Sequence, residues 1–290
     1  MLWVLLSLGS ALFQVLRNMV MKRLGHALDE TINVWGRFTF ILPFAAVPLV
    51  FTGLPARQPG VYWYALLFGV TQLVGTQCLA LALKVAEISL VTALWKLSLA
   101  LLVVWGYLAL GEQPSAAGVV GVLVCVAGVY LINVGRARVS LWAPLVSLFR
   151  DPGQRYTLGA ALFYAPAVVL IKKIALLSSA TFAVFIGYLF CSLLITPWVL
   201  YRSARHFRQL GRHWLGFVGL GAFAALSTQL GTTAYTMTVS SYVEAVKQVE
   251  IVLALLIGWL VFGEGARIRQ IWVGCTVMLA GIVILILGRG

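Results

Sequence analysis

The sequence predicts an all-α integral membrane protein with ten transmembrane helices, built as two inverted five-helix repeats. Three observations lead to this fold class: the composition, the length of the apolar runs, and an alignment of the two halves of the chain. The chain has 290 residues, of which 62% are hydrophobic and 10% charged, and its mean hydropathy is +1.00. Soluble domains contain roughly 45–50% apolar and roughly 25% charged residues. The composition therefore excludes a soluble enzyme, a disordered chain and a disulfide-stapled secreted domain.

Ten apolar runs are each long enough to cross a bilayer, which takes a helix of roughly 20 residues. The runs cover residues 2–21, 31–52, 61–82, 88–109, 115–134, 155–176, 180–200, 214–236, 240–262 and 268–287. The basic residues of the N-terminal segment, Arg17, Lys22 and Arg23, lie at the far end of the first run. A cleavable signal carries its positive charge before its apolar stretch. We therefore expect the first run to be a retained span.

The longest break between runs divides the chain into its two predicted repeats, residues 1–135 and 155–290. Residues 136–154 form this break, and we expect them to be a cytoplasmic linker. Within it, Leu141, Leu145 and Leu148 have the spacing of one helix face. The linker is therefore either a short amphipathic helix on the membrane surface or a plain connection.

The charge distribution predicts how the chain is oriented in its membrane. The chain carries 21 Lys and Arg against 8 Asp and Glu, a formal charge of +13. Most of the basic residues fall in the breaks after the first, third, fifth, seventh and ninth runs. Because basic residues collect in cytoplasmic loops, both termini are expected outside the cytoplasm. The basic residues are not interleaved with aromatics in a polar segment, so we expect no nucleic-acid partner.

An internal repeat is the most informative feature of the sequence. Residues 89–112 align without a gap on residues 241–264, and both stretches end in Gly-Glu. Residues 120–136 align on 273–289 after a one-residue shift and share glycines at seven-residue spacing. We interpret these glycines as positions where helices pack closely. Since each repeat holds five spans, an odd number, the second repeat is inverted relative to the first, as in secondary transporters.

The ends of the two halves carry a family resemblance. The segments LALGEQPSAAGVVGVLVCVAGVYLI and LVFGEGARIRQIWVGCTVMLAGIVILI resemble the EamA branch of the drug/metabolite transporter superfamily. The resemblance implies an exporter or exchanger of small metabolites and leaves the substrate open. The segment VEAVKQVEIVL at 243–253 also resembles the lysine-containing span that related transporters use for anionic cargo. It lacks their second basic residue, because Gln248 follows Lys247.

These features predict a secondary active transporter of a small polar or anionic metabolite, working by alternating access between the repeats. The alternatives are a flippase for lipids or lipid-linked carriers, and a membrane-embedded enzyme acting on a lipid carrier. The chain is not expected to be an enzyme, because its eight carboxylates form no cluster in the sequence. No GxxxxGK[ST] motif occurs, so ATP-driven transport by this chain alone is excluded.

Proton coupling is the expected energy source, without cofactor or metal. The expected partners are a small-molecule substrate and membrane lipids, and the chain is expected to be a monomer or a dimer. The expected location is the cell membrane, as a multi-pass protein of the bacterial inner membrane.

The candidate site centres on Lys247 and Glu250. Lys247 is the eighth residue of its predicted span, which places it about 12 Å into the membrane at 1.5 Å per residue. Glu250 is three residues further and lies on the same face of a continuous helix. The two are either a structural ion pair or a pair that contacts cargo. Glu244 is expected nearer the outer surface, as a residue of the mouth.

Further residues are expected to line the path of the cargo. Lys96 occupies the matching depth in the first repeat, either facing the cavity or bonding to a neighbouring helix. The other substrate-binding candidates are Gln72, Gln77, Gln229, Trp95, Tyr235 and Arg37. The polar members of this set either line the path or join helices, the aromatic ones either line it or pack, and Arg37 either reaches the site or lies at the headgroups.

Overall fold

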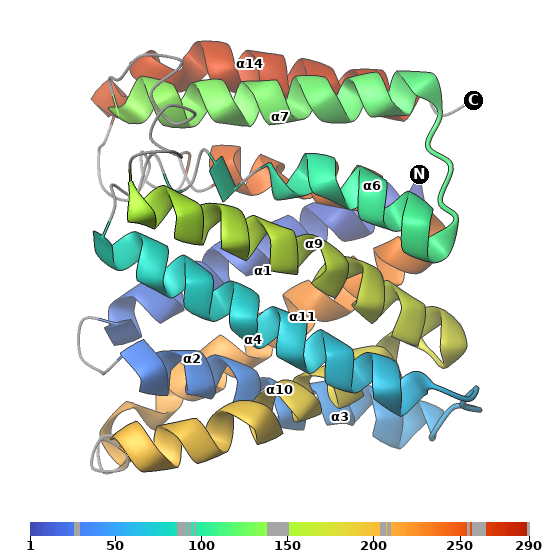
Figure 1. The fold of residues 1–290 in the computed structure, drawn as a ribbon, viewed down its shortest axis with the longest axis vertical. Coiled ribbons are helices and arrows are strands. Elements are labelled where there is room, and N and C mark those ends of the chain that lie inside the picture. The colour runs from blue at the N-terminus through green and yellow to red at the C-terminus, as the bar shows by residue number, and fades with distance from the viewer. Residues whose placement is uncertain are drawn as a thin grey trace. The chain divides into compact units, whose positions relative to one another are not determined.

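The computed structural model describes residues 1–25, 30–85, 91, 94–95, 97–137, 151–203, 207, 210–253, 256 and 265–288. This part of the chain is helical and contains no strand (Figure 1). Six of its helices are long and apolar enough to cross a membrane: Leu2–Met21, Thr31–Thr52, Val61–Ala82, Pro152–Leu177, Ala180–Ser203 and Gly211–Met237. Shorter apolar helices lie at Ser98–Leu110, Ala116–Ile132 and Trp272–Leu287. The prediction of an all-α membrane protein is confirmed.

The chain forms two compact units. Unit 1 contains residues 1–73 and 170–237, and unit 2 contains residues 74–169 and 238–290. Each unit draws on both halves of the sequence, so the units are not the predicted repeats 1–135 and 155–290. Residues 138–150, which hold the predicted amphipathic helix of the linker, lie outside the described residues.

Unit 1 is built on pairs of long helices. Its elements are α1 (Leu2–Gly25), α2 (Glu30–Thr39), α3 (Ile41–Thr52), α10 (Ala180–Ser203) and α11 (Trp214–Met237), with the first part of α4 (Val61–Val85) and the last part of α9 (Pro152–Leu177). α1 packs along α11, and α10 packs on α2 and α3. The predicted span 31–52 is interrupted at Phe40, between α2 and α3.

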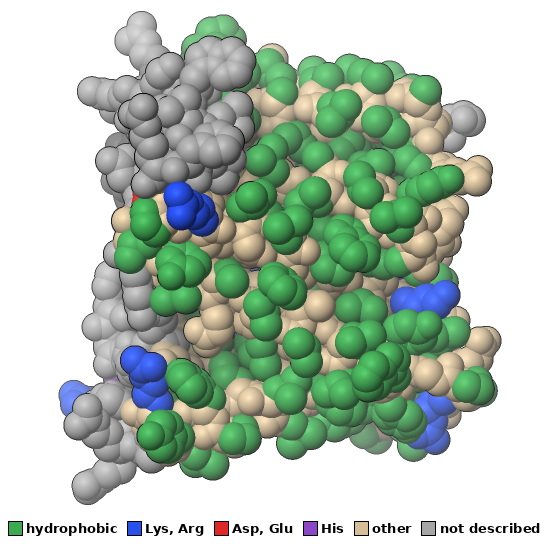
Figure 2. All heavy atoms as spheres, viewed as in Figure 1, with side chains coloured by type: hydrophobic (Ala, Val, Ile, Leu, Met, Phe, Trp, Pro, Cys, Tyr) green, Lys and Arg blue, Asp and Glu red, His purple; other side chains and the backbone are tan. Residues whose placement is uncertain are grey.

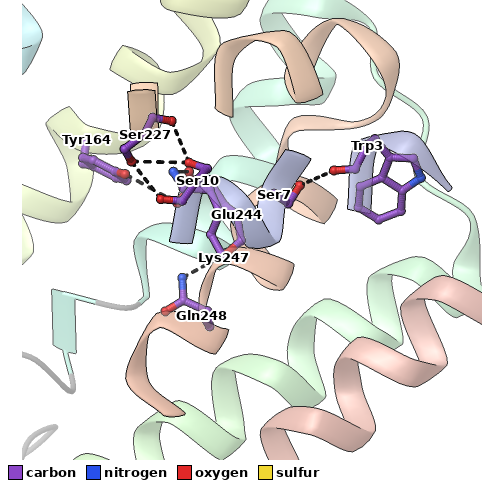
Figure 3. Close-up of polar contacts among 8 residues, drawn as sticks. All are labelled: Trp3, Ser7, Ser10, Tyr164, Ser227, Glu244, Lys247 and Gln248. Atoms are coloured by element: carbon purple, nitrogen blue, oxygen red, sulfur yellow. Dashed lines mark hydrogen bonds and ion pairs between the residues drawn. The ribbon is translucent and has the colours of Figure 1, made fainter. Parts of the chain in front are cut away.

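Two serines join α1 and α11 through reciprocal hydrogen bonds. The Ser10 hydroxyl donates to the Ser227 carbonyl oxygen at 2.8 Å, and the Ser227 hydroxyl donates to the Ser10 carbonyl oxygen at 2.9 Å (Figure 3). Both serines are buried. Such bonds let the two helices approach closely and fix their register.

Unit 2 contains α6 (Ser98–Leu110), α7 (Ala116–Ala137), α12 (Ser240–Lys247) and α14 (Gly265–Leu287), with the remaining parts of α4 and α9. α7 and α14 pack against each other along the glycines that the sequence predicts as close-packing positions. A Cβ on Gly128 would lie 2.5 Å from Cα of Met278, and a Cβ on Gly274 would lie 2.8 Å from the Gly128 oxygen. These backbones are too close for any side chain, so the packing prediction is confirmed.

The surface of the described chain is largely apolar. Figure 2 shows hydrophobic side chains over most of the described surface in that view, with Lys and Arg in a few separate places. Large side chains such as Leu5, Val50 and Tyr201 are 66%, 80% and 89% exposed. An apolar surface of this extent requires lipid around it.

Two predicted spans are broken helices rather than continuous ones. In the span 88–109, Leu97 is a turn residue whose N–H donates to the Leu94 oxygen at 3.0 Å, and α6 begins directly after it. In the span 240–262, Gln248 is a turn residue whose N–H donates to the Ala245 oxygen at 3.1 Å. Leu97 aligns with Val249 in the repeat, so the two breaks fall within one residue of each other. Interrupted helices at matching repeat positions are typical of transporter binding sites.

Candidate functional site

A buried ion pair lies at the second of these breaks. Lys247, the last residue of α12, places its Nζ 2.5 Å from Oε1 of Glu244, one turn earlier on the same helix (Figure 3). Lys247 is 7% exposed and Glu244 is 6% exposed. Ionised groups at membrane depth cost roughly 2.5–3.5 kcal/mol each on insertion scales. The mutual pairing offsets this cost for both side chains.

The partner of Lys247 differs from the one expected from the sequence. Spacing alone makes Glu250 and Glu244 equivalent, since each lies three residues from Lys247, and the prediction from the sequence pairs Lys247 with Glu250. α12 ends at Lys247, and Glu250 lies beyond the turn residue Gln248. The structure places Glu244 against Lys247, and Glu250 is half-buried.

Aromatic and amide groups of unit 2 surround the pair. The Tyr164 hydroxyl of α9 donates to Oε2 of Glu244 at 3.4 Å. Trp95 meets the Tyr164 ring edge-on, with ring centroids 5.4 Å apart. Gln248 donates its amide Nε2 to the Glu244 backbone oxygen at 3.0 Å, while its Oε1 is buried without a hydrogen-bond partner in the described part of the chain. The site thus combines an ammonium, a carboxylate, an aromatic wall and one unsatisfied acceptor.

The Gly-Glu turn of the first repeat positions the start of α12. Gly111 closes α6 with φ of 65°, a left-handed conformation that favours glycine, and its N–H donates to the Tyr107 oxygen. The Glu112 carboxylate then accepts the Ser240 backbone N–H at 3.1 Å and the Ser240 hydroxyl at 2.7 Å. A carboxylate at a helix N-terminus is favourable for the helix dipole. The Gly-Glu signal at 111–112 therefore marks a helix-capping turn, which sequence reasoning did not assign, and its repeat at 263–264 lies outside the described residues.

Tyr242 adds a second tie at the same end of α12. Its hydroxyl oxygen accepts the Ser115 backbone N–H at 2.9 Å, and the Ser115 hydroxyl donates to the Gly288 oxygen at 2.7 Å. Four helix ends of unit 2, those of α6, α7, α12 and α14, are joined in this way. The eight-residue helix that ends in Lys247 is thereby held at its first turn.

The other predicted site residues divide between the two units. Trp95 joins the Lys247 site through Tyr164, and Gln77 is an exposed residue of unit 2. Gln72, Gln229, Tyr235 and Arg37 belong to unit 1, where Gln72 and Tyr235 are buried and Gln229 and Arg37 are half-buried. Lys96 lies outside the described residues. Within the described chain, no three His, Cys, Asp or Glu side chains lie together as metal ligands.

The helices and the buried ion pair define a multi-pass membrane protein, and comparison with known proteins gives its family. The EamA-like transporter family matches residues 1–134 and 152–287, so the chain belongs to that family. A riboflavin transporter of Vibrio cholerae serotype O1 is 29% identical over 126 residues. That match spans 43% of this chain and 41% of the transporter. A solved crystal structure aligns with a TM-score of 0.75 and 17% identity over 99% of this chain and 97% of that chain, which shows a common fold.

Proposed function

We propose that the protein is a secondary active transporter of a small polar or anionic metabolite, with Lys247 and Glu244 at its cargo site. The observation that carries this proposal is the buried Lys247–Glu244 pair at the interruption of a helix. Ionisable groups inside a membrane protein mark transport pathways more often than packing positions. Membership of the EamA-like transporter family supports the same function.

The proposed architecture is ten transmembrane helices in two inverted repeats that expose the site alternately to each side. Three features support it: the alignment of 89–112 with 241–264, the two separate family matches, and the helix breaks at matching repeat positions. The proposed location is a bacterial inner membrane with both termini outside the cytoplasm, and the proposed partners are cargo and membrane lipids. The proposed oligomeric state is a monomer or a dimer.

The proposed mechanism couples cargo to protons through Glu244. Without cargo, the Lys247 ammonium and the Glu244 carboxylate neutralise each other. An anionic or strongly polar group of the cargo competes for the ammonium, and a carboxylate without its counter-charge takes up a proton more readily. Cargo and proton both bind to the same conformation of the protein. They therefore cross the membrane together when the two repeats move from the inward-open to the outward-open arrangement or back. Tyr164 keeps its hydrogen bond to the carboxyl group and holds its orientation.

Riboflavin is the first cargo to test. The name of the Vibrio cholerae relative supports this choice, as does the aromatic pair Trp95–Tyr164 beside the ion pair. A flat heteroaromatic ring packs well against such side chains. The unsatisfied Oε1 of Gln248 suits a cargo that carries an N–H or O–H donor.

The test is uptake by proteoliposomes. The purified chain is reconstituted in liposomes, and riboflavin fluorescence and a panel of radiolabelled organic acids are followed with and without a proton gradient. The proposal expects cargo accumulation that depends on the gradient and is lost in Lys247→Met, while empty liposomes stay at background. Absence of uptake for every compound, together with protein-dependent movement of a labelled lipid between leaflets, would favour the flippase alternative.

A further inference from the structure

Two polar side chains on α2 stand one turn apart and carry unsatisfied hydrogen-bonding atoms. They are Asn33 and Arg37, both in unit 1. The oxygen Oδ1 of Asn33 and the nitrogen Nε of Arg37 are buried without a hydrogen-bond partner in the described chain. Residues four apart on a helix share one face, with Cβ atoms about 5–6 Å apart. One face of α2 therefore carries both an unsatisfied acceptor and an unsatisfied donor among the described residues.

The orientation of Asn33 is fixed by its other bond. Its Nδ2 donates to the Met21 carbonyl oxygen of α1 at 3.0 Å, so the amide oxygen must be the atom that lacks a partner. Asn33 is 6% exposed. An unsatisfied buried acceptor costs about 1–3 kcal/mol, which is a reason to look for a ligand that satisfies it.

Arg37 has no counter-charge among the described residues. It makes no hydrogen bond or ion pair with them, and its guanidinium carbon lies 5.5 Å from the centre of the Phe38 ring. Lys247 differs, because Glu244 neutralises it. Arg37 is the seventh residue of the apolar helix Thr31–Thr52, about 9 Å from its start at 1.5 Å per residue.

One donor of this arginine is withdrawn from solvent. Arg37 is half-buried, and its Nε has no solvent contact and no hydrogen-bond partner in the described part of the chain. A fixed positive charge in this setting favours an anion, and the planar guanidinium matches the oxygens of a carboxylate or phosphate.

We propose that Asn33 and Arg37 form a subsite for an anionic oxyacid group that carries a neighbouring O–H or N–H donor. The guanidinium binds the anionic oxygens, and Oδ1 of Asn33 accepts the donor. The ligand class is a hydroxy acid, an amino acid or a singly protonated phosphate. The inference rests on the proposed function in taking the ligand to be cargo, and it divides the cargo classes: an anion with an adjacent donor is expected to bind Asn33 and Arg37, whereas uncharged riboflavin is not.

The test is the thermal unfolding of the purified full-length chain in detergent with three small probes at equal ionic strength. Sodium glycolate has both the anion and the donor, sodium acetate has the anion alone, and glycolamide has the donor without the charge. Glycolate is expected to raise the melting temperature by about 2–4 °C once it exceeds its dissociation constant several-fold. Acetate is expected to give a smaller rise, and glycolamide none.

Variants of single residues test whether the shift in melting temperature depends on Asn33 and Arg37. Arg37→Gln is expected to abolish the response to glycolate. Asn33→Asp is expected to abolish it as well, because the new carboxylate pairs internally with Arg37, although the loss of the Nδ2 donor to the Met21 oxygen lowers the melting temperature without ligand. Arg202→Gln removes an exposed arginine of the same unit and is expected to respond as the wild type does. If Arg37→Gln does not fold, Arg37→Lys serves in its place, with a weakened response expected.

Three outcomes would overturn the proposal: no shift of the wild type by glycolate, an unchanged shift in the Arg37 variant, or equal shifts with glycolamide. A shift with phosphatidylglycerol that needs Arg37, in the absence of any shift with glycolate, would assign the site to a lipid headgroup and also overturn it. The Lys247→Met variant separates this inference from the proposed function. It is expected to lose transport and still respond to glycolate.

Discussion

The glycine contact between α7 and α14 gives a prediction whose size follows from the structure. In Gly128→Ala, the new Cβ would lie 2.5 Å from Cα of Met278, whereas ordinary contacts begin at 3.4 Å. Both atoms are fixed by helical backbone, so the helices must separate by about 0.9 Å or more. Overpacking of this kind costs about 1–3 kcal/mol. Alanine regains up to about 1 kcal/mol through its helix propensity. We expect a net loss of about 1–2 kcal/mol and a melting temperature several degrees lower.

Gly219→Ala in α11 is the matched control. A Cβ at Gly219 meets nothing within 4 Å, so alanine is expected to leave stability unchanged or raise it by up to about 1 kcal/mol. Unfolding is followed with a thiol-reactive dye as the rise in labelling when the two fully buried thiols, Cys125 and Cys191, become exposed, above the labelling of half-buried Cys78 and Cys275. Equal melting temperatures for the two alanine variants would refute the close packing of α7 on α14.

Three further predictions concern the helix cap, the serine pair and the topology. Glu112→Gln is expected to cost about 1–2 kcal/mol in thermal unfolding, because a neutral amide replaces the carboxylate that caps α12 at Ser240; an unchanged melting temperature would contradict the capping role. A double-mutant cycle of Ser10→Ala and Ser227→Ala is expected to give a coupling energy of about 0.6 kcal/mol and at most about 1.7 kcal/mol, and zero coupling would show that the bonds are not mutually dependent. A reporter fused after Gly290 that is active only in the cytoplasm is expected to be silent, and a strong signal would reverse the proposed topology.

The extents of the helices could be predicted from hydropathy alone. The predicted runs 61–82 and 214–236 correspond to α4 (Val61–Val85) and α11 (Trp214–Met237), with ends that differ by a few residues at most. Hydropathy sets these lengths because each helix must match the bilayer. The glycine positions were equally predictable, since a seven-residue spacing repeated in both halves indicates a shared packing face.

The breaks within helices could not be predicted in the same way. Leu97 and Gln248 interrupt apolar runs with neither Gly nor Pro at those positions, whereas the break at Phe40 precedes Pro43, which lacks the N–H that would bond the Thr39 oxygen. Backbone bonds three residues apart occur at Leu97 and Gln248, and a single sequence does not reveal them.

The partner of Lys247 was missed for the same reason. Glu244 and Glu250 are equally spaced from it, and only the end of α12 at Lys247 distinguishes them. The paired Gly-Glu dipeptides are visible as a repeat in the sequence, yet the bond from Ser240 to Glu112 joins residues 128 positions apart and depends on the fold. The unsatisfied oxygen of Asn33 could not be predicted either, because it follows from the hydrogen bond between the Asn33 amide nitrogen and the Met21 carbonyl oxygen.

The central claim is that Lys247 and Glu244 carry cargo and proton rather than only hold α12 together. Lys247→Met alone strands the Glu244 carboxylate and is expected to cost about 3–5 kcal/mol of stability. Combining it with Glu244→Gln removes both charges and is expected to restore the melting temperature.

Proton-driven uptake by proteoliposomes of this stable double variant is the most direct measurement. We expect the double variant to take up cargo only at the level of empty liposomes, whereas the wild type accumulates cargo along the proton gradient. Uptake by the double variant at the wild-type rate would show that the pair is structural and would contradict the account.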